Sequence, residues 1–252
     1  MPAVTATDTV TARGVRMRVR PWRGRPDTAE LSVVPAGAVV PPNLVALAVE
    51  RARDRGYDEV VTPALPRIEW RPYVDVGFSV REELHLLAHD LLSLPERRES
   101  GREHHLRRVL RRDRDRVLAV DGSAFDPFWR LDADALEDAV RATPSTRFRM
   151  ERSGRGYALT GRAGDRGYVQ RLAVDPGAQG AGLGSALLVD GLAWLRRWRV
   201  REALVNTQTG NERAIALYER LGFRRRAEGL AVLELPIASH PSPPAPDPGP
   251  VP

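Results

Sequence analysis

The chain has 252 residues, a formal net charge of +6 and 42% apolar residues, so it can form one large domain or two small ones around a buried core. It contains no cysteine, which excludes disulfides, thiolate metal sites and a cysteine nucleophile and fits a reducing, cytoplasmic setting. No apolar run approaches the length of a bilayer span, so we expect no membrane segment.

Composition divides the chain into two segments of mixed character between low-complexity ends. Residues 1–12 and the proline-rich stretch 238–252 are predicted to be disordered. A first segment, 13–93, is separated by a charged linker, 94–104, from a second segment, 105–237.

The second segment has the clearer pattern of elements. The expected order is helix, helix, strand, strand, strand, helix, strand, helix, strand. These elements begin at about Asp113, Asp132, Thr146, Gly156, Gly167, Leu183, Glu202, Asn211 and Leu230. The order predicts a mixed α/β fold whose sheet is mostly antiparallel.

A glycine-rich stretch, "DPGAQGAGLGSALL" from Asp175, joins the third of these strands to the following helix. A strand, a glycine turn and a helix N-terminus together favour an anion-binding site, because free N–H groups and the helix dipole point to one place. A P-loop requires a lysine that the chain lacks, and Ser185 interrupts the dinucleotide fingerprint. The remaining pattern is Q-x-x-G-x-G, formed by Gln179, Gly182 and Gly184; a plain turn without a ligand is the alternative.

The stretches "QRLAVDPGAQGAGLGSALL" and "NTQTGNERAIALYERLGF" resemble the acetyl-CoA-binding core of the GNAT N-acetyltransferases. The resemblance covers roughly Arg107 to Leu235 and implies the GNAT fold, an α/β fold in which two central strands splay apart to admit a thioester. It implies acetyl-CoA as co-substrate, no metal, and acetyl transfer to a primary amine of a small molecule or a protein N-terminus. This half is similar to relatives that acetylate protein N-termini, including that of a ribosomal protein.

The resemblance also assigns roles to individual residues. The positions implied to hold acetyl-CoA are Leu172, Ala173, Val174, Gln179, Gly180, Ala181, Gly182, Leu183, Gly184, Ser185, Asn206 and Asn211. Leu172 to Val174 would pair with the pantetheine arm, the loop would take the pyrophosphate, and Asn206 would end the splayed strand.

Tyr218 is the implied general acid. Asn211 and Tyr218 are seven residues apart on one expected helix and therefore share a face. A phenol within reach of the leaving thiolate can supply its proton. The alternative is a structural tyrosine packed beside Gly222 and Phe223.

The general base has no equally clear candidate. Many relatives place a carboxylate in the strand before the loop, but the stretch Tyr168 to Arg171 has none. A water chain or Glu212 is left to accept the proton.

The first segment resembles a partial copy of the second. "YVDVGF" from Tyr73 repeats the Y-x-x-x-G-F spacing of "YERLGF" from Tyr218, and "LVALAVERARDRGYDEVV" from Leu44 has the pattern of a helix followed by a strand. We therefore expect a tandem GNAT protein with a degenerate N-terminal half; chance similarity is the alternative.

The loop of that first copy is unsuited to a phosphate. In "GAVVPPNL", Pro41 and Pro42 lack N–H donors, and Val40 and Leu44 add bulk where the second copy has glycine. We expect this half to keep the fold and to bind no CoA.

A non-catalytic CoA-sensing or nucleic-acid-binding module on the same fold is the alternative function. Arginines gather at 107–112 and 224–226, but without interleaved aromatic residues they favour a solvated face over a nucleic-acid site. We expect no nucleic-acid partner, and the sequence does not predict an oligomeric state.

Overall fold

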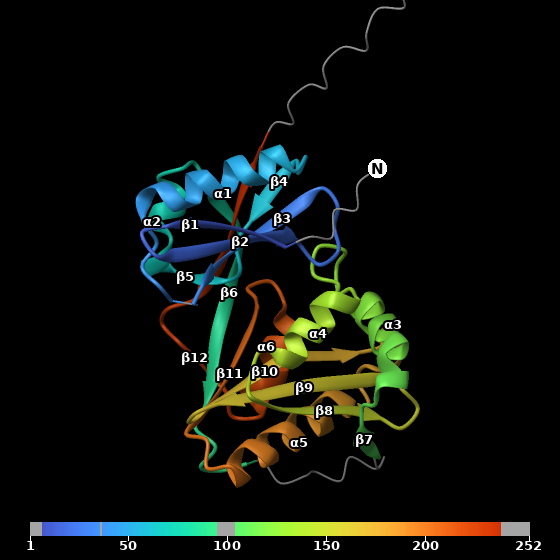
Figure 1. Ribbon diagram of the computed structural model, residues 1–252. Helices are drawn as coiled ribbons and strands as arrows, with labels where there is room; N and C mark the ends of the chain where they lie inside the picture. Colours follow the sequence, from blue (N-terminus) through green and yellow to red (C-terminus); the bar gives the residue numbers. More distant parts are fainter. Residues whose placement is uncertain (1–6, 36, 95–103, 238–252) are drawn as a thin grey trace, which may run out of the picture. The chain divides into compact units, whose positions relative to one another are not determined.

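A computed structural model describes residues 7–35, 37–94 and 104–237 of the chain. The chain forms two compact units, one comprising Met1–Arg81 with Val232–Pro252 and the other Glu82–Ala231 (Figure 1). The linker expected at 94–104 and the tail expected at 238–252 lie almost wholly outside the described residues. Among the residues described, no helix combines the length and the apolar character that crossing a bilayer requires.

The first unit is a mixed sheet with one long helix. Its strand order is β1-β2-β3-β4-β13, and β5 also pairs with β13. The β3–β4 pair is parallel, whereas the β1–β2, β2–β3 and β4–β13 pairs are antiparallel. Its elements are β1 (Asp8–Ala12), β2 (Val15–Pro21), β3 (Thr28–Val34), α1 (Pro42–Asp54), β4 (Glu59–Val61), β5 (Leu65–Pro66), α2 (Arg71–Val74) and β13 (Leu230–Pro236).

The first strand corrects one expectation. Asp8–Ala12 pairs along its whole length with β2, although residues 1–12 are predicted from composition to be disordered. The alternation of Thr9 and Thr11 with Val10 suits a pleated edge strand, and β-branched residues favour this conformation. A bias toward threonine and alanine therefore concealed a short amphipathic strand.

The second unit is a larger mixed sheet with helices on both faces (Figure 1). Its strand order is β6-β11-β10-β9-β8-β7, with β12 also pairing with β6. Its elements are β6 (Ser79–His89), β7 (Leu106–Arg108), α3 (Arg114–Ala124), α4 (Ala133–Arg141), β8 (Ser145–Glu151), β9 (Gly156–Ala163), β10 (Arg166–Val174), α5 (Leu183–Arg197), β11 (Glu202–Gln208), α6 (Glu212–Arg220) and β12 (Arg224–Arg225).

Helix α5 packs closely onto this sheet because two glycines leave room for it. A Cβ at Gly167 would lie 2.5 Å from Leu195 Cδ1, and one at Gly191 would lie 2.5 Å from Thr160 Oγ1. The buried face of α5 includes Leu188, Leu192 and Leu195, whose spacing of four and three residues places them on one side of a helix. The fold class is therefore the expected one, mixed α/β with mostly antiparallel strands.

The two sequence segments exchange their last strands. β13 ends the second segment but pairs antiparallel with β4 of the first unit. β6 ends the first segment but pairs antiparallel with β11, from Ala203↔His89 to Gln208↔Leu84. The unit boundaries therefore differ from the expected 13–93 and 105–237, because strand pairing over long sequence separations is not visible in local composition.

The first unit nevertheless repeats the central topology of the second. In β3–α1–β4, as in β10–α5–β11, a strand leads through a loop and a helix to a parallel neighbour. Helix α1 begins at Pro42 with Pro41 as its N-cap residue and no side-chain cap. The expected degenerate GNAT-like repeat is thus present, with prolines at the helix start.

Candidate functional site

The two central strands of the second unit separate after a short paired stretch. β10 and β11 are joined only from Arg166↔Glu202 to Tyr168↔Leu204. Beyond these residues β10 continues to Val174 while remaining paired with β9 on its other side. The register shift in β10 between Val169 and Arg171 lies where the separation begins. We call the space beyond Tyr168 and Leu204 the strand gap.

One edge of β10 therefore faces the strand gap. Leu172, Ala173 and Val174 lie in this stretch, bonded to β9 on one side and not to β11 on the other. Backbone groups along such an edge can accept an extended ligand as they would another strand.

The loop after β10 presents a run of unpaired backbone donors. Asp175 caps a short turn by accepting from Gly177 N at 3.0 Å, and Gly180 and Gly182 then adopt left-handed φ values of 82° and 85°. Within the described part of the chain, the N–H groups from Gly180 to Ser185 form no hydrogen bonds. Together with the N-terminal dipole of α5 they form a site suited to an anion.

Two arginines of α6 lie beside this loop. Arg220 Nη2 is 3.5 Å from Ser185 Oγ, and Arg213 Nη2 would lie 4.0 Å from a Cβ at Gly180. Both side chains come from exposed positions seven residues apart on one helix. The sequence reasoning missed this pair, although its spacing on a helix after the loop is the signal that could have found it.

Gln179 and Asn211 have structural roles of their own. Gln179 Nε2 donates to Val174 O at 2.9 Å, so its side chain turns back to the end of β10. Asn211 is the N-cap of α6, with Oδ1 accepting from Ala214 N at 3.1 Å. Asn206 does not end its strand: β11 continues to Gln208, and Asn206 is exposed opposite Leu86.

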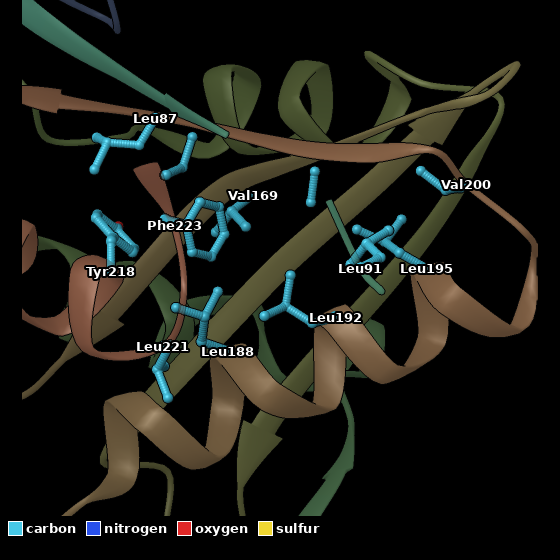
Figure 2. Close-up of a cluster of buried hydrophobic side chains, with 12 residues drawn as sticks. Leu87, Leu91, Val169, Leu188, Leu192, Leu195, Val200, Tyr218, Leu221 and Phe223 are labelled. Carbon is cyan, nitrogen blue, oxygen red and sulfur yellow. The ribbon is translucent and has the colours of Figure 1, made fainter. Parts of the chain in front are cut away.

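Tyr218 lies in the core between α5 and the sheet. Its ring is 5.6 Å from that of Phe223, and Figure 2 shows both gathered with Leu188 and Leu221. Burial raises the pKa of Tyr218 to about 12, and the nearby cation of Arg171 partly offsets this. Within the described residues the hydroxyl has no hydrogen-bond partner, so it is a neutral phenol whose proton is not committed to the protein.

A buried ionic cluster, formed by Asp121, Tyr157 and Arg171, stands at the strand gap. Asp121 Oδ2 accepts from Arg171 Nε at 2.7 Å and from the Tyr157 hydroxyl at 2.5 Å, while Oδ1 accepts from Arg171 Nη2 at 2.9 Å. Asp121 is 0% exposed and Arg171 9% exposed. The sequence reasoning missed this cluster, whose only local signal is an aspartate on the apolar face of α3 beside Val117 and Val120.

Besides Asp121, two carboxylates are candidates for the general base, Glu212 and Glu82. Glu212 is exposed in the first turn of α6. Glu82 of β6 is half-buried, and its Oε2 accepts from Trp129 Nε1 at 2.6 Å. Glu82 was not a candidate from the sequence because β6 was assigned to the other half of the chain.

Residues 122–223 match the model of the acetyltransferase (GNAT) family. These residues include the strand gap, the glycine loop and Tyr218. The second unit contains a GNAT domain. The matched range ends at Phe223, so the family model accounts for the site and not for the first unit.

Curated relatives of this GNAT domain share one name. The chain is 51% identical over 61 residues to a mycothiol acetyltransferase of Geodermatophilus obscurus, covering 24% of this chain and 20% of that protein. It is 38% identical over 126 residues to a mycothiol acetyltransferase of Thermomonospora curvata, covering 46% of this chain and 42% of that protein. The match thus spans less than half the length of these relatives.

Among solved structures, the chain is similar to a tandem GNAT protein from the clavulanic acid biosynthesis pathway. The TM-score is 0.63 at 18% identity, with 96% of this chain and 86% of that chain covered. At this identity the likeness concerns the fold, and it extends over both units. The tandem arrangement expected from the sequence is therefore confirmed.

Proposed function

We propose that this protein is an acetyl-CoA-dependent N-acetyltransferase that transfers an acetyl group to a primary amine. The observation that carries the proposal is the strand gap, which opens beside a loop of unpaired N–H donors in a GNAT domain. A glycine turn without a ligand would leave those donors with no function.

The residues present fit acetyl-CoA. The N–H groups from Gly180 to Ser185 suit a pyrophosphate, and Arg213 and Arg220 add positive charge beside them. The free edge of β10 at Leu172–Val174 suits the amide groups of the pantetheine arm. Asn211 retains its Nδ2 donor, because only its Oδ1 caps α6.

Tyr218 is the group suited to protonate the departing thiolate. Its raised pKa keeps the hydroxyl protonated throughout the neutral range. Its uncommitted hydroxyl can donate without breaking a bond to the protein. When bound, acetyl-CoA supplies the activated acyl group; the protein supplies position and the proton.

The name of the relatives favours a small-molecule acceptor over a protein N-terminus. In this proposal the protein acts in the cytoplasm, in keeping with a chain without cysteine. Two arginines of the cluster 224–226 form salt bridges within the protein, Arg225 with Glu219 at 2.8 Å and Arg226 with Glu202, and these neutralise part of the positive charge of the cluster. This pairing favours a solvated surface over a nucleic-acid site.

The proposal is tested by calorimetry and by CoA release. Wild-type protein should bind acetyl-CoA and release CoA in the presence of an acceptor amine. Gly182→Pro should weaken binding strongly, because proline removes a donor and cannot adopt φ 85°. Gly164→Pro, which strains another left-handed turn at φ 58°, is the control and should bind normally. Equal affinity of Gly182→Pro and wild type would refute the loop assignment, and binding without turnover of any amine would favour the non-catalytic alternative.

A further inference from the structure

One face of the sheet at the strand gap carries polar side chains from two adjacent strands. In the antiparallel pair of β6 and β11, Leu87 lies opposite Val205, and both belong to the core that contains the leucines of α5. Side chains alternate along a strand, so Asn206, one residue after Val205, lies on the opposite face. Glu82, five residues before Leu87 in β6, lies on that same opposite face.

The segment between α3 and α4 crosses this face at the strand gap. Trp129 Nε1 donates to Glu82 Oε2 in β6 at 2.6 Å, and Trp129 O accepts from Arg171 Nη2 in β10 at 2.7 Å. β6 and β10 are the two neighbours of β11, so Trp129 spans β11. Since Arg171 lies beyond the last pair at Tyr168, this crossing is over the open part of β10 and β11.

The crossing segment is held in place by the buried cluster. Asp121 Oδ1 accepts from Leu131 N at 2.8 Å, and the Arg171 guanidinium stacks 3.4 Å from the centre of the Phe125 ring. Phe128 packs edge-on against Trp129, with ring centres 5.2 Å apart. A segment with so many fixed points is a rigid wall, and rigid supports keep a binding group at its working position.

We propose that Glu82 receives the primary amine of the acceptor at this wall and takes a proton from its ammonium form. This inference rests on the proposed acetyltransferase function. Glu82 Oε2 is held by Trp129, whereas Oε1 has no partner within the described residues. A carboxylate oxygen with no partner suits a cationic amine, because a charged donor and a charged acceptor form a strong hydrogen bond.

The proton transfers balance with the chemistry of acetyl transfer. Glu82 takes one proton from the ammonium and passes it to water, and the freed lone pair forms the C–N bond to the acetyl carbon. The C–S bond breaks as Tyr218 gives its proton to sulfur. The second proton on nitrogen returns to the Tyr218 oxygen through water, so one proton is released overall.

The other carboxylates near the gap are less suited to this role. Asp121 already accepts four hydrogen bonds, from Tyr157, Leu131 and twice from Arg171. Glu83 is adjacent to Glu82 in β6 and therefore lies on the opposite face. Of these three carboxylates, Glu82 is the one that lies on the gap face and has an oxygen without a partner in the described part of the chain.

The test compares Glu82→Gln with the matched control Glu83→Gln. CoA release is measured with acetyl-CoA and a panel of glucosamine, ethanolamine and a peptide with a free N-terminal alanine. At pH 7.5, Glu82→Gln should lower kcat/KM for the amine about 100-fold or more, while its affinity for acetyl-CoA and the activity of Glu83→Gln stay at the wild-type level. The deficit should shrink as the pH rises toward the pKa of the amine, because the amine then arrives already neutral.

A second variant separates the carboxylate from its support. Trp129→Phe keeps an aromatic side chain, although a smaller one, and removes the N–H that donates to Oε2, so it should lower kcat/KM by about tenfold, less than Glu82→Gln. Equal activity of Glu82→Gln and Glu83→Gln, or a deficit that is the same at every pH, would overturn the role of Glu82 alone. Absence of turnover by wild-type protein with the whole panel would overturn the proposed function and this inference together.

Discussion

Replacing Tyr218 with phenylalanine tests the proton donor and its environment in one variant. The side-chain volume is kept and the hydroxyl has no hydrogen-bond partner in the described part of the chain, so folding at pH 8 should be unaffected. If the phenol protonates the thiolate, turnover should fall by about 10²–10⁴-fold while the affinity for acetyl-CoA is retained. CoA release and calorimetry on the same preparation measure both quantities.

The raised pKa of Tyr218 also predicts how the free energy of unfolding depends on pH. The phenol has a pKa of about 12 in the folded protein against an ordinary value of 10.0. The pKa of the phenol is higher in the folded protein than in the unfolded chain. The contribution of the protonated phenol to the free energy of unfolding is therefore fully present below pH 10 and is lost as the pH rises through 12. At pH 11 ionisation favours the unfolded wild-type chain tenfold, or about 1.4 kcal/mol, and phenylalanine has no such term.

Denaturant unfolding at pH 8 and at pH 11 measures this difference. Tyr218→Phe should match wild type at pH 8 and be more stable by about 1.4 kcal/mol at pH 11, since the other tyrosines titrate in both proteins. A stability difference that does not change between the two pH values would show that the phenol is solvated, and unchanged turnover would show that the thiolate leaves unassisted.

Three further outcomes follow from the site and the fold. Replacing both Arg213 and Arg220 with alanine should weaken acetyl-CoA binding and flatten its dependence on salt; calorimetry at two ionic strengths measures this, and an unchanged salt dependence would contradict it. Asp121→Asn should destabilise the protein by about 3–5 kcal/mol in urea unfolding, because it leaves Arg171 buried without a counter-charge, and a loss below ~1 kcal/mol would contradict this. Deleting residues 1–100 should abolish cooperative unfolding, because it removes β6 from beside β11, whereas a cooperative transition in that fragment would show that β6 is dispensable.

The elements that the sequence predicted are those with a local physical signal. α5 has such a signal, because Leu188, Leu192 and Leu195 recur at helical spacing, and the helix begins at Leu183, the predicted residue. The glycine turn before α5 was expected as well, and within it Gly180 and Gly182 adopt left-handed φ values that residues without a Cβ reach easily.

The parts that were missed depend on partners distant in sequence. Arg171 lies in the stretch of strand where many relatives have a carboxylate. Its burial is explained by Asp121, which α3 brings close enough to form a salt bridge with it. Glu82 was assigned to the wrong half because its strand pairs across the linker. The end of β11 was placed at Asn206 although pairing with β6 extends it to Gln208. In each case the deciding contact joins segments that no local window contains.

Because β6 and β13 are exchanged between the two halves of the chain, neither sheet can be completed early in synthesis. β6 leaves the ribosome long before β11, and the register that joins His89 to Ala203 cannot form until most of the chain exists. The pairing of β4 with β13 forms even later, because Glu59 pairs with Pro236 near the end of the described chain. Such long loop closures slow folding. Each half must therefore remain incomplete, with a strand edge open, until the other is made. Cutting the backbone between Leu94 and His104 would consequently not yield two independent domains, since each fragment would carry a strand that the other fragment's sheet requires.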